Sequence, residues 1–275
     1  MQVGSELTME SFLPLARMRE LGKTAHSTYI DAQPFPHIVF DNFFDPELVD
    51  RVLSEFPAPG AIRWQSFDNA EEVKLASSVE ATFGPTTRLF LYHLNSMTFL
   101  NFLSQVTGIE NLIPDPGFEG GGLHQIVRGG KLGVHADFNR HTQLRLDRRL
   151  NVLLYLNQEW KEEYGGHFEL WDQQMTAPVR KILPIFNRCA IFSTTSTSYH
   201  GHPNPLACPA GRTRKSMAIY YYSNGRPAEE VNDEHTTLFQ EQPGASMWRI
   251  GNVKKFIRAV TPPILMDAVS RNRRA

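Results

Sequence analysis

The sequence predicts a mainly β fold with flanking helices, whose core is a sandwich, barrel or jelly roll. Three observations predict it. Short strand-like runs follow one another from about residue 120, Gly-Gly pairs separate several of them, and no helical pattern lies between them. The missing helices disfavour a parallel α/β fold. The runs are Leu123–Val127, Leu132–Phe138, Leu150–Asn157, His167–Trp171, Ala190–Ser193 and Ser216–Tyr222.

The composition is that of an ordinary globular protein. The 275 residues are 41% hydrophobic and 21% charged, which suits one large domain with a sizeable core. The formal net charge of −1 gives no field that would attract nucleic acid or an anionic membrane, and no apolar run approaches membrane-spanning length. We therefore expect neither nucleic acid nor membrane as a partner.

Cysteine content and the first residues bear on location. The only two cysteines, Cys189 and Cys208, lie in different local contexts, which favours a reduced protein over a disulfide scaffold. Acidic residues interrupt the first 25 positions, so a signal peptide is not expected. A cytoplasmic location follows as an expectation.

The first 40 residues predict one helix and one strand. Ser11 is a suitable N-cap, Pro14 is tolerated in the first turn, and Gly22 ends the helix. Residues 23–34 form a polar linker in this interpretation, and Pro36–Phe40 form a short strand.

A second helix starts at Asp45-Pro46-Glu47, because a capping side chain, a proline and an acid occupy its first positions. Pro57 ends it. Its apolar stripe contains Leu48, Val49, Val52, Leu53 and Phe56.

The remaining segments before the core are less regular. Residues 60–87 receive no assignment, Arg88–Tyr92 are interpreted as a strand, and Ser96 caps a helix that Gly108 closes.

Beyond the core, apolar residues at helical spacing predict a further helix, and the arginine-rich end is a solvated tail. We therefore divide the chain into an N-terminal support region (1–115), a catalytic core (116–225) and a partly helical C-terminal extension (226–275), within one structural domain. The spaced apolar residues are Val253, Phe256, Ile257 and Val260.

A candidate metal site begins with His135 and Asp137. These residues are two apart on an expected strand, so they share a face, while their neighbours face the core. A later histidine completes a 2-His-1-carboxylate triad, which leaves open positions on a non-haem Fe(II). We favour His200 as this third ligand, with His202 as the alternative. His124, His141 and His167 are interpreted as ordinary polar residues of half-exposed strands.

Arg214 and Tyr155 form a candidate carboxylate site. Arg214 shares a strand face with small residues, and an arginine at the mouth of a small barrel can bind a carboxylate through two hydrogen bonds. Tyr155 could supply a hydroxyl to the same group. The alternatives are a surface cation for Arg214 and a core aromatic for Tyr155.

Taken in order, these motifs resemble a known family. The order is His135-X-Asp137, Tyr155-Leu156-Asn157, Gly165-Gly166, Pro184, His200 and Arg214. It resembles the Fe(II)/2-oxoglutarate-dependent dioxygenases, and within them the prolyl 4-hydroxylase-like group, over roughly residues 120–222 and more loosely over Pro36–Pro57.

The resemblance implies a double-stranded β-helix, a cupin-like jelly roll. It further implies that His135, Asp137 and His200 bind Fe(II), and that Arg214 and Tyr155 hold the distal carboxylate of 2-oxoglutarate. Ascorbate is a further candidate cofactor. The expected reaction is hydroxylation of an unactivated C–H bond, with release of succinate and CO2.

Two departures from the family pattern leave alternatives open. The insert 204–211 between His200 and Arg214 leaves His202 and Arg212 as competing assignments. The strand that contains His167, Glu169 and Trp171 replaces the usual small residues, and these three side chains are expected to line the substrate pocket.

Other functions compete with this interpretation. A cupin-like isomerase or hydrolase would keep the metal but not need the carboxylate site, and a non-enzymatic jelly-roll binding module would use the basic stretch Arg140–Arg149. The expected partners are O2 and a small-molecule or peptidyl substrate. The sequence does not identify the substrate or the oligomeric state.

Overall fold

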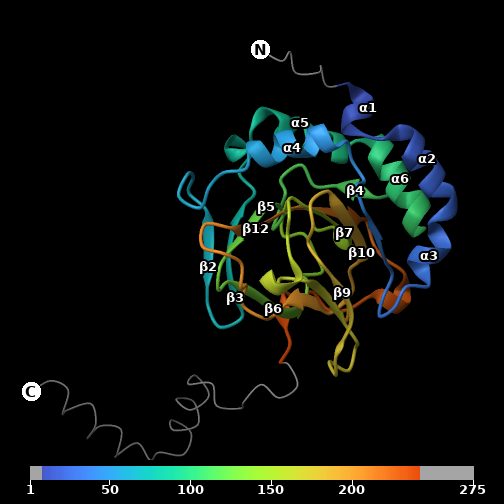
Figure 1. Cartoon of the computed structure of the whole chain (residues 1–275). Helices are drawn as coiled ribbons and strands as arrows, with labels where there is room; N and C mark the ends of the chain where they lie inside the picture. Colours follow the sequence, from blue (N-terminus) through green and yellow to red (C-terminus); the bar gives the residue numbers. More distant parts are fainter. Residues whose placement is uncertain (1–7, 242–275) are drawn as a thin grey trace, which may run out of the picture. The chain divides into compact units, whose positions relative to one another are not determined.

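The computed structural model describes residues 8–241, and its strands join into one wound, antiparallel sheet (Figure 1). The described residues up to Gln240 belong to one compact unit. The helices are α1 (Met9–Phe12), α2 (Leu15–Thr24), α3 (His26–Ile30), α4 (Pro46–Ser54), α5 (Pro85–Leu94) and α6 (Met97–Thr107). The strands are β1 (His37–Phe40), β2 (Gln65–Asp68), β3 (Glu72–Ser77), β4 (Ile113–Pro114), β5 (Gly122–Val127), β6 (Lys131–Ala136), β7 (Asp147–Tyr155), β8 (Phe168–Trp171), β9 (Pro178–Ile182), β10 (Arg188–Ser193), β11 (His200–His202), β12 (Thr213–Ser223) and β13 (Leu238–Phe239).

The strand order is that of a jelly roll. Neighbours run β1-β10-β7-β12-β5-β3-β6-β11-β8-β9, so strands distant in the chain lie side by side. β2 pairs with β3, β4 with β12, and β13 with β6. The predicted mainly β class with a double-stranded β-helix core is therefore confirmed.

Alternation along β7 separates a core face from a cavity face. Leu150, Val152 and Leu154 join the main hydrophobic core, whereas Asn151 and Leu153 line a cavity. Because successive strand side chains point to opposite faces, one strand can both anchor the fold and furnish the site.

The neighbouring strand β12 has the same division. Met217, Ile219 and Tyr221 join the helix-covered core, and Ser216 and Tyr220 line the cavity. The helices gather on one side of the strands in Figure 1, and their apolar side chains belong to this same core.

Helix α4 begins as its sequence predicts. The Asp45 carboxylate accepts a hydrogen bond from the Glu47 amide at 2.8 Å, and Pro46 occupies the first turn. The strand predicted over Pro36–Phe40 is also present, as β1 paired with β10.

The N-terminal helix prediction is wrong in extent. Three short helices replace one, because Gly22 lies within α2 and α3 occupies part of the expected linker. A glycine inside a helix costs only about 1 kcal/mol, which the burial of Met18 and Tyr29 in the core offsets here.

The strand predicted at Arg88–Tyr92 is also wrong, because this segment lies inside α5. Its buried residues are Thr87, Phe90, Leu91 and Leu94, which have the spacing of one helical face. The helix prediction between Ser96 and Gly108 is confirmed as α6, with Gly108 in the left-handed conformation at φ +73°.

Residues 60–87, left unassigned from the sequence, form β2, β3 and a short 3-10 turn. Strands β9 and β11 also lie outside the predicted runs. The helix predicted around residues 253–260 and the basic tail lie outside the described residues, and the boundaries at 115 and 225 stay predictions.

Cys189 and Cys208 are both buried free thiols. Within residues 8–241, no helix is long and apolar enough to cross a membrane.

Candidate metal and cosubstrate site

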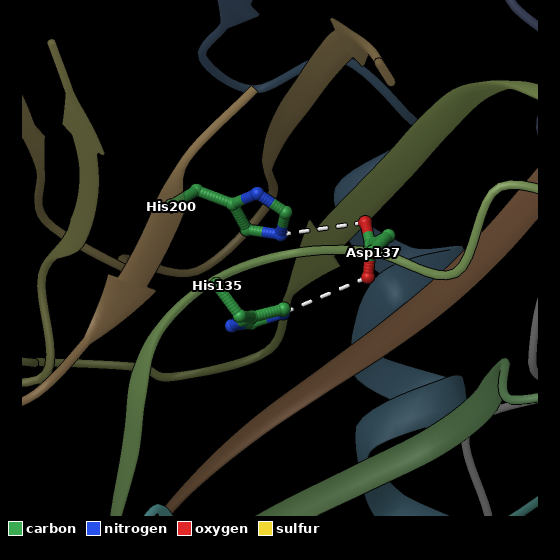
Figure 2. A group of neighbouring side chains, drawn as sticks. All are labelled: His135, Asp137 and His200. Atoms are coloured by element: carbon green, nitrogen blue, oxygen red, sulfur yellow. Dashed lines mark ion pairs between the residues drawn. The ribbon is translucent and has the colours of Figure 1, made fainter. Parts of the chain in front are cut away.

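His135, Asp137 and His200 meet at one point of the cavity. β6 carries His135 and ends one residue before Asp137, and His200 opens β11 directly opposite His135 in the sheet register. His135 Nε2 lies 3.6 Å from Asp137 Oδ1, and His200 Nε2 lies 3.5 Å from Asp137 Oδ2. Figure 2 shows both rings directed at the carboxylate between them. The structure thus brings together the three side chains that the sequence singled out.

Both histidines are held in one tautomer. His135 Nδ1 donates to the Gly133 carbonyl at 2.8 Å, and His200 Nδ1 donates to the Ser198 carbonyl at 2.9 Å. A carbonyl only accepts, so the proton is on Nδ1 and the Nε2 lone pair remains for another partner. Metal-binding histidines are oriented in this way.

Burial determines the protonation state of His200. Burial lowers the pKa of His200 to about 4, although the Asp137 carboxylate opposes that effect. His200 is therefore neutral near pH 7, the form in which imidazole binds a metal.

The Asp137 carboxylate is held by side chains that sequence reasoning missed. Its Oδ2 accepts from Asn151 Nδ2 at 2.8 Å and lies 3.2 Å from Arg148 Nη2. Burial would raise the pKa of Asp137, but the charge of Arg148 and the contacts with His200 and His135 hold it well below its usual range. The carboxylate is consequently ionised and oriented before any metal binds.

Arg148 is almost fully buried beside the triad. Its guanidinium carbon lies 3.5 Å from the Tyr220 ring centre and 4.3 Å from the Phe138 ring centre, and its Nε donates to Asn151 Oδ1 at 3.0 Å. Within a run of basic residues it has the local sequence pattern of a surface cation. Asn151 could have been identified from the sequence, because it shares the inward face of β7 with Tyr155.

The cavity has a volume of about 490 Å³, and Arg214 lines it at a distance from the triad. Arg214 is buried, and its Nε donates to the Gly166 carbonyl at 2.8 Å. Gly166 has φ +71°, and a Cβ there would lie only 3.0 Å from Arg214 Cδ, so glycine permits this close approach.

Tyr155 lies beside Arg214, with 5.0 Å between the guanidinium carbon and the ring centre. Burial raises the pKa of Tyr155 to about 12, with the Arg214 charge opposing, so the hydroxyl keeps its proton. Among the described residues, that hydroxyl has no hydrogen bond of ordinary geometry. An unpaired donor beside a buried cation suits an anionic ligand.

The competing arginine and histidine have different surroundings. Arg212 donates to the backbone carbonyls of Gln158 and Glu159, each at 3.2 Å, and does not line the cavity. His202 lines the cavity but lies outside the group of three whose ligand atoms are within 4.8 Å of one another.

Three expectations about other side chains are wrong. His167, Glu169 and Trp171 do not line the cavity, because Phe168 and Leu170 turn the apolar face of β8 inward. Glu169 instead lies 3.1 Å from Lys181 Nζ and accepts from Trp171 Nε1.

His124 is a half-exposed residue of β5, as expected, whereas His141 is not a strand residue. His124 lines the cavity, and burial lowers its pKa to about 3. His141 is buried in a loop, between Asp115 at 3.5 Å and Glu119 at 3.2 Å.

The donor set fits Fe(II). Two histidines and one ionised carboxylate are the ligands of the 2-His-1-carboxylate site, which leaves open positions for a cosubstrate and oxygen. The buried Arg214 of the same cavity, with the unpaired Tyr155 hydroxyl beside it, fits a carboxylate.

Comparisons with known proteins agree with the geometry. The family model described as the 2OG-Fe(II) oxygenase superfamily matches residues 121–222. No curated protein sequence matches the chain.

Two solved structures share the fold. One is a prolyl hydroxylase from Trichoplax adhaerens, in complex with a hypoxia inducible factor peptide fragment: 18% identity, TM-score 0.54, covering 80% of this chain and 94% of that one. The other is a Pseudomonas putida prolyl-4-hydroxylase: 16% identity, TM-score 0.52, covering 77% and 99%. Residues 121–222 of this chain therefore match the 2OG-Fe(II) oxygenase superfamily, and the chain has a prolyl 4-hydroxylase-like fold.

Proposed function

We propose that this chain is an Fe(II)- and 2-oxoglutarate-dependent hydroxylase. One oxygen atom of O2 would enter an unactivated C–H bond of the substrate as a hydroxyl group, and the other would enter succinate as 2-oxoglutarate loses CO2. The observation that carries the proposal is that the 2-His-1-carboxylate group and the buried Arg214 line one cavity, and that Tyr155, whose hydroxyl is unpaired, lies beside Arg214.

The protein side chains have separate roles in this proposal. His135 and His200 offer Nε2 to the metal, and Asp137 adds a negative charge that favours a divalent cation. Bound Fe(II) would supply oxygen activation coupled to decarboxylation of 2-oxoglutarate. Arg214 and Tyr155 bind the distal carboxylate and so orient the keto acid toward the triad.

The remaining walls are assigned to the substrate. The β2–β3 hairpin contributes Phe67 and Lys74, and Thr237 and Phe239 line the cavity near β6. The ring centres of Phe239 and His135 lie 5.4 Å apart. A small molecule or a peptidyl side chain is the proposed substrate, as the mixture of apolar and polar walls suits either one.

Further parts of the proposal are ascorbate as an additional cofactor and a cytoplasmic location. Neither nucleic acid nor membrane is a proposed partner. Measuring activity with and without ascorbate, and fractionating the source cells, would test these two points.

Replacing the carboxylate tests the reaction. We expect Asp137→Ala to reduce succinate formation to background when purified protein is given Fe(II), 2-oxoglutarate, O2 and candidate substrates. The candidates are prolyl peptides, amino acids and saccharides. The physical reason is that the metal loses its anionic ligand.

The matched control is His167→Ala. His167 pairs with Glu162 outside the cavity, so succinate formation should be unchanged. Wild-type turnover in Asp137→Ala would remove this residue from the ligand set. Turnover of a substrate without 2-oxoglutarate would instead favour the cupin-like isomerase or hydrolase.

A further inference from the structure

His202 is a buried polar side chain that the proposed reaction does not yet use. It is 4% exposed and lines the same cavity as the triad and Arg214. Neither of its ring nitrogens has a hydrogen-bond partner among the described residues. The other two histidines of this wall, His135 and His200, each use Nδ1 to donate to a backbone carbonyl.

An imidazole with both nitrogens unpaired is costly to bury. An unsatisfied buried polar group carries an uncompensated desolvation penalty, so such a group in a cavity indicates a missing partner. The protein supplies no partner within residues 8–241, and His202 lines the cavity, so a molecule bound there can reach its ring.

The metal is not the best partner. His202 is absent from the group whose ligand atoms lie within 4.8 Å of one another, although it is only two residues from His200. His200 lies opposite His135 and His202 lies opposite Leu132 in the sheet register, so the two side chains occupy different positions along β11.

The neighbours of His202 suggest an anion instead. His202 and the buried Arg214 line the same cavity, so a ligand there can contact both side chains. Arg214 extends toward Gly166, close to the start of β8, and β11 pairs with β8. Tyr155, whose hydroxyl is also unpaired, lies against the same guanidinium.

We propose that His202 donates a hydrogen bond to the distal carboxylate of 2-oxoglutarate, as a third binding residue beside Arg214 and Tyr155. This inference rests on the proposed function. A carboxylate has two oxygens with about four lone-pair sites, so it can accept from a guanidinium, a phenol and a neutral imidazole together. His202 then contributes to the affinity and specificity for a dicarboxylic keto acid.

The experiment compares two keto acids of equal length. One is 2-oxoglutarate, and the other is 2-oxopentanoate, which has a methyl group in place of the distal carboxylate. Each is titrated without oxygen into protein loaded with Fe(II), and the absorption of the keto acid–Fe(II) chelate reports the dissociation constant. Binding of Mn(II) alone is measured by calorimetry.

We expect His202→Leu to weaken 2-oxoglutarate binding about ten-fold, because a hydrogen bond to a charged group is lost. Its affinities for 2-oxopentanoate and for Mn(II) should equal those of the wild type. His202→Gln keeps an N–H donor and should recover part of the loss. His167→Leu, the same substitution outside the cavity, should change none of these values.

Specific outcomes overturn the inference. Equal losses for both keto acids would make His202 a packing residue, and a loss of Mn(II) affinity would make it a metal ligand. Unchanged 2-oxoglutarate affinity in a folded His202→Leu variant would also reject it. If wild-type protein with Fe(II) binds no 2-oxoglutarate, the proposed function itself fails, and the role of His202 with it.

Discussion

At the scale of the residue, the two oxygens of Asp137 have different neighbours. Oδ2 accepts a hydrogen bond from the Asn151 amide and lies beside the Arg148 guanidinium. Neither contact involves Oδ1, which faces His135. A carboxylate held at one oxygen cannot rotate freely, so its other oxygen is prepared for a metal. Residues that hold a metal ligand in this way typically change metal affinity by about 10–100-fold.

The Asn151 amide can be removed with little change in volume or charge. We expect Asn151→Leu to weaken Mn(II) binding about ten-fold, because Asp137 loses its shortest hydrogen bond. Calorimetric titration of the metal-free protein measures this.

The control for Asn151 is its inward-facing neighbour on β7. Leu153→Met changes an apolar side chain that lines the cavity without a polar contact to Asp137, so its metal affinity should match the wild type. Equal affinities for Asn151→Leu and the wild type would show that the amide does not position the carboxylate.

At the scale of the element, α5 depends on a residue from another segment. Glu55, just after α4, accepts from the Thr86 and Thr87 amides at 2.9 and 2.8 Å and from the Thr87 hydroxyl at 2.7 Å. These amides belong to the first turn of α5, whose own N-cap residue is Gly84. A carboxylate there satisfies unpaired amides and complements the helix dipole.

The contribution of Glu55 should depend on pH. Burial tends to raise its pKa, but the hydrogen bonds from Thr87 and Thr86 outweigh burial and lower it from the ordinary 4.5. A lowered folded-state pKa means that the stabilisation is present above 4.5 and is lost as pH falls through the folded value. We expect Glu55→Gln to reduce the free energy of unfolding by about 0.5–2 kcal/mol at pH 7.

Urea unfolding at pH 7 and at pH 3 would test this. The difference between Glu55→Gln and the wild type should shrink at the lower pH, as the Glu55 carboxylate becomes protonated. As a control, Glu47→Gln makes the same substitution in the first turn of α4. A difference that stays constant with pH would contradict the ionised cap.

At the scale of the whole molecule, the sheet joins the helix-covered core to the cavity. Side chains on the helix-covered face of β7, β10 and β12 belong to one hydrophobic core with residues of α2, α4, α5 and α6. Side chains on the opposite face of the same strands line the cavity. The site is consequently built on strands that the core holds rigid.

Leu154 tests how much this core contributes. It is fully buried on the helix-covered face of β7, so Leu154→Ala should reduce the free energy of unfolding by about 2–5 kcal/mol. The same substitution at Leu89, which is 50% exposed on α5, should cost under about 1 kcal/mol. Denaturant unfolding monitored by circular dichroism compares them, and similar losses would contradict this description of the core.

The fold class, the capped start of α4 and the candidate triad could be predicted from the sequence alone. Each depends on a short-range pattern: strand alternation at His135 and Asp137, or capping at Asp45 and Pro46. These patterns can be recognised in the sequence because the alternation of side chains along a strand and the hydrogen bonds in the first turn of a helix involve only neighbouring residues.

The positions of side chains that depend on pairing between distant strands became known only from the tertiary structure. It placed His200 opposite His135, turned Arg214 rather than Arg212 into the cavity, and buried Arg148 against Asp137. It also turned Phe168, not His167, inward and made Arg88–Tyr92 helical through a cap from Glu55. The physical reason is that register and burial arise from pairing across the chain, which local spacing does not encode.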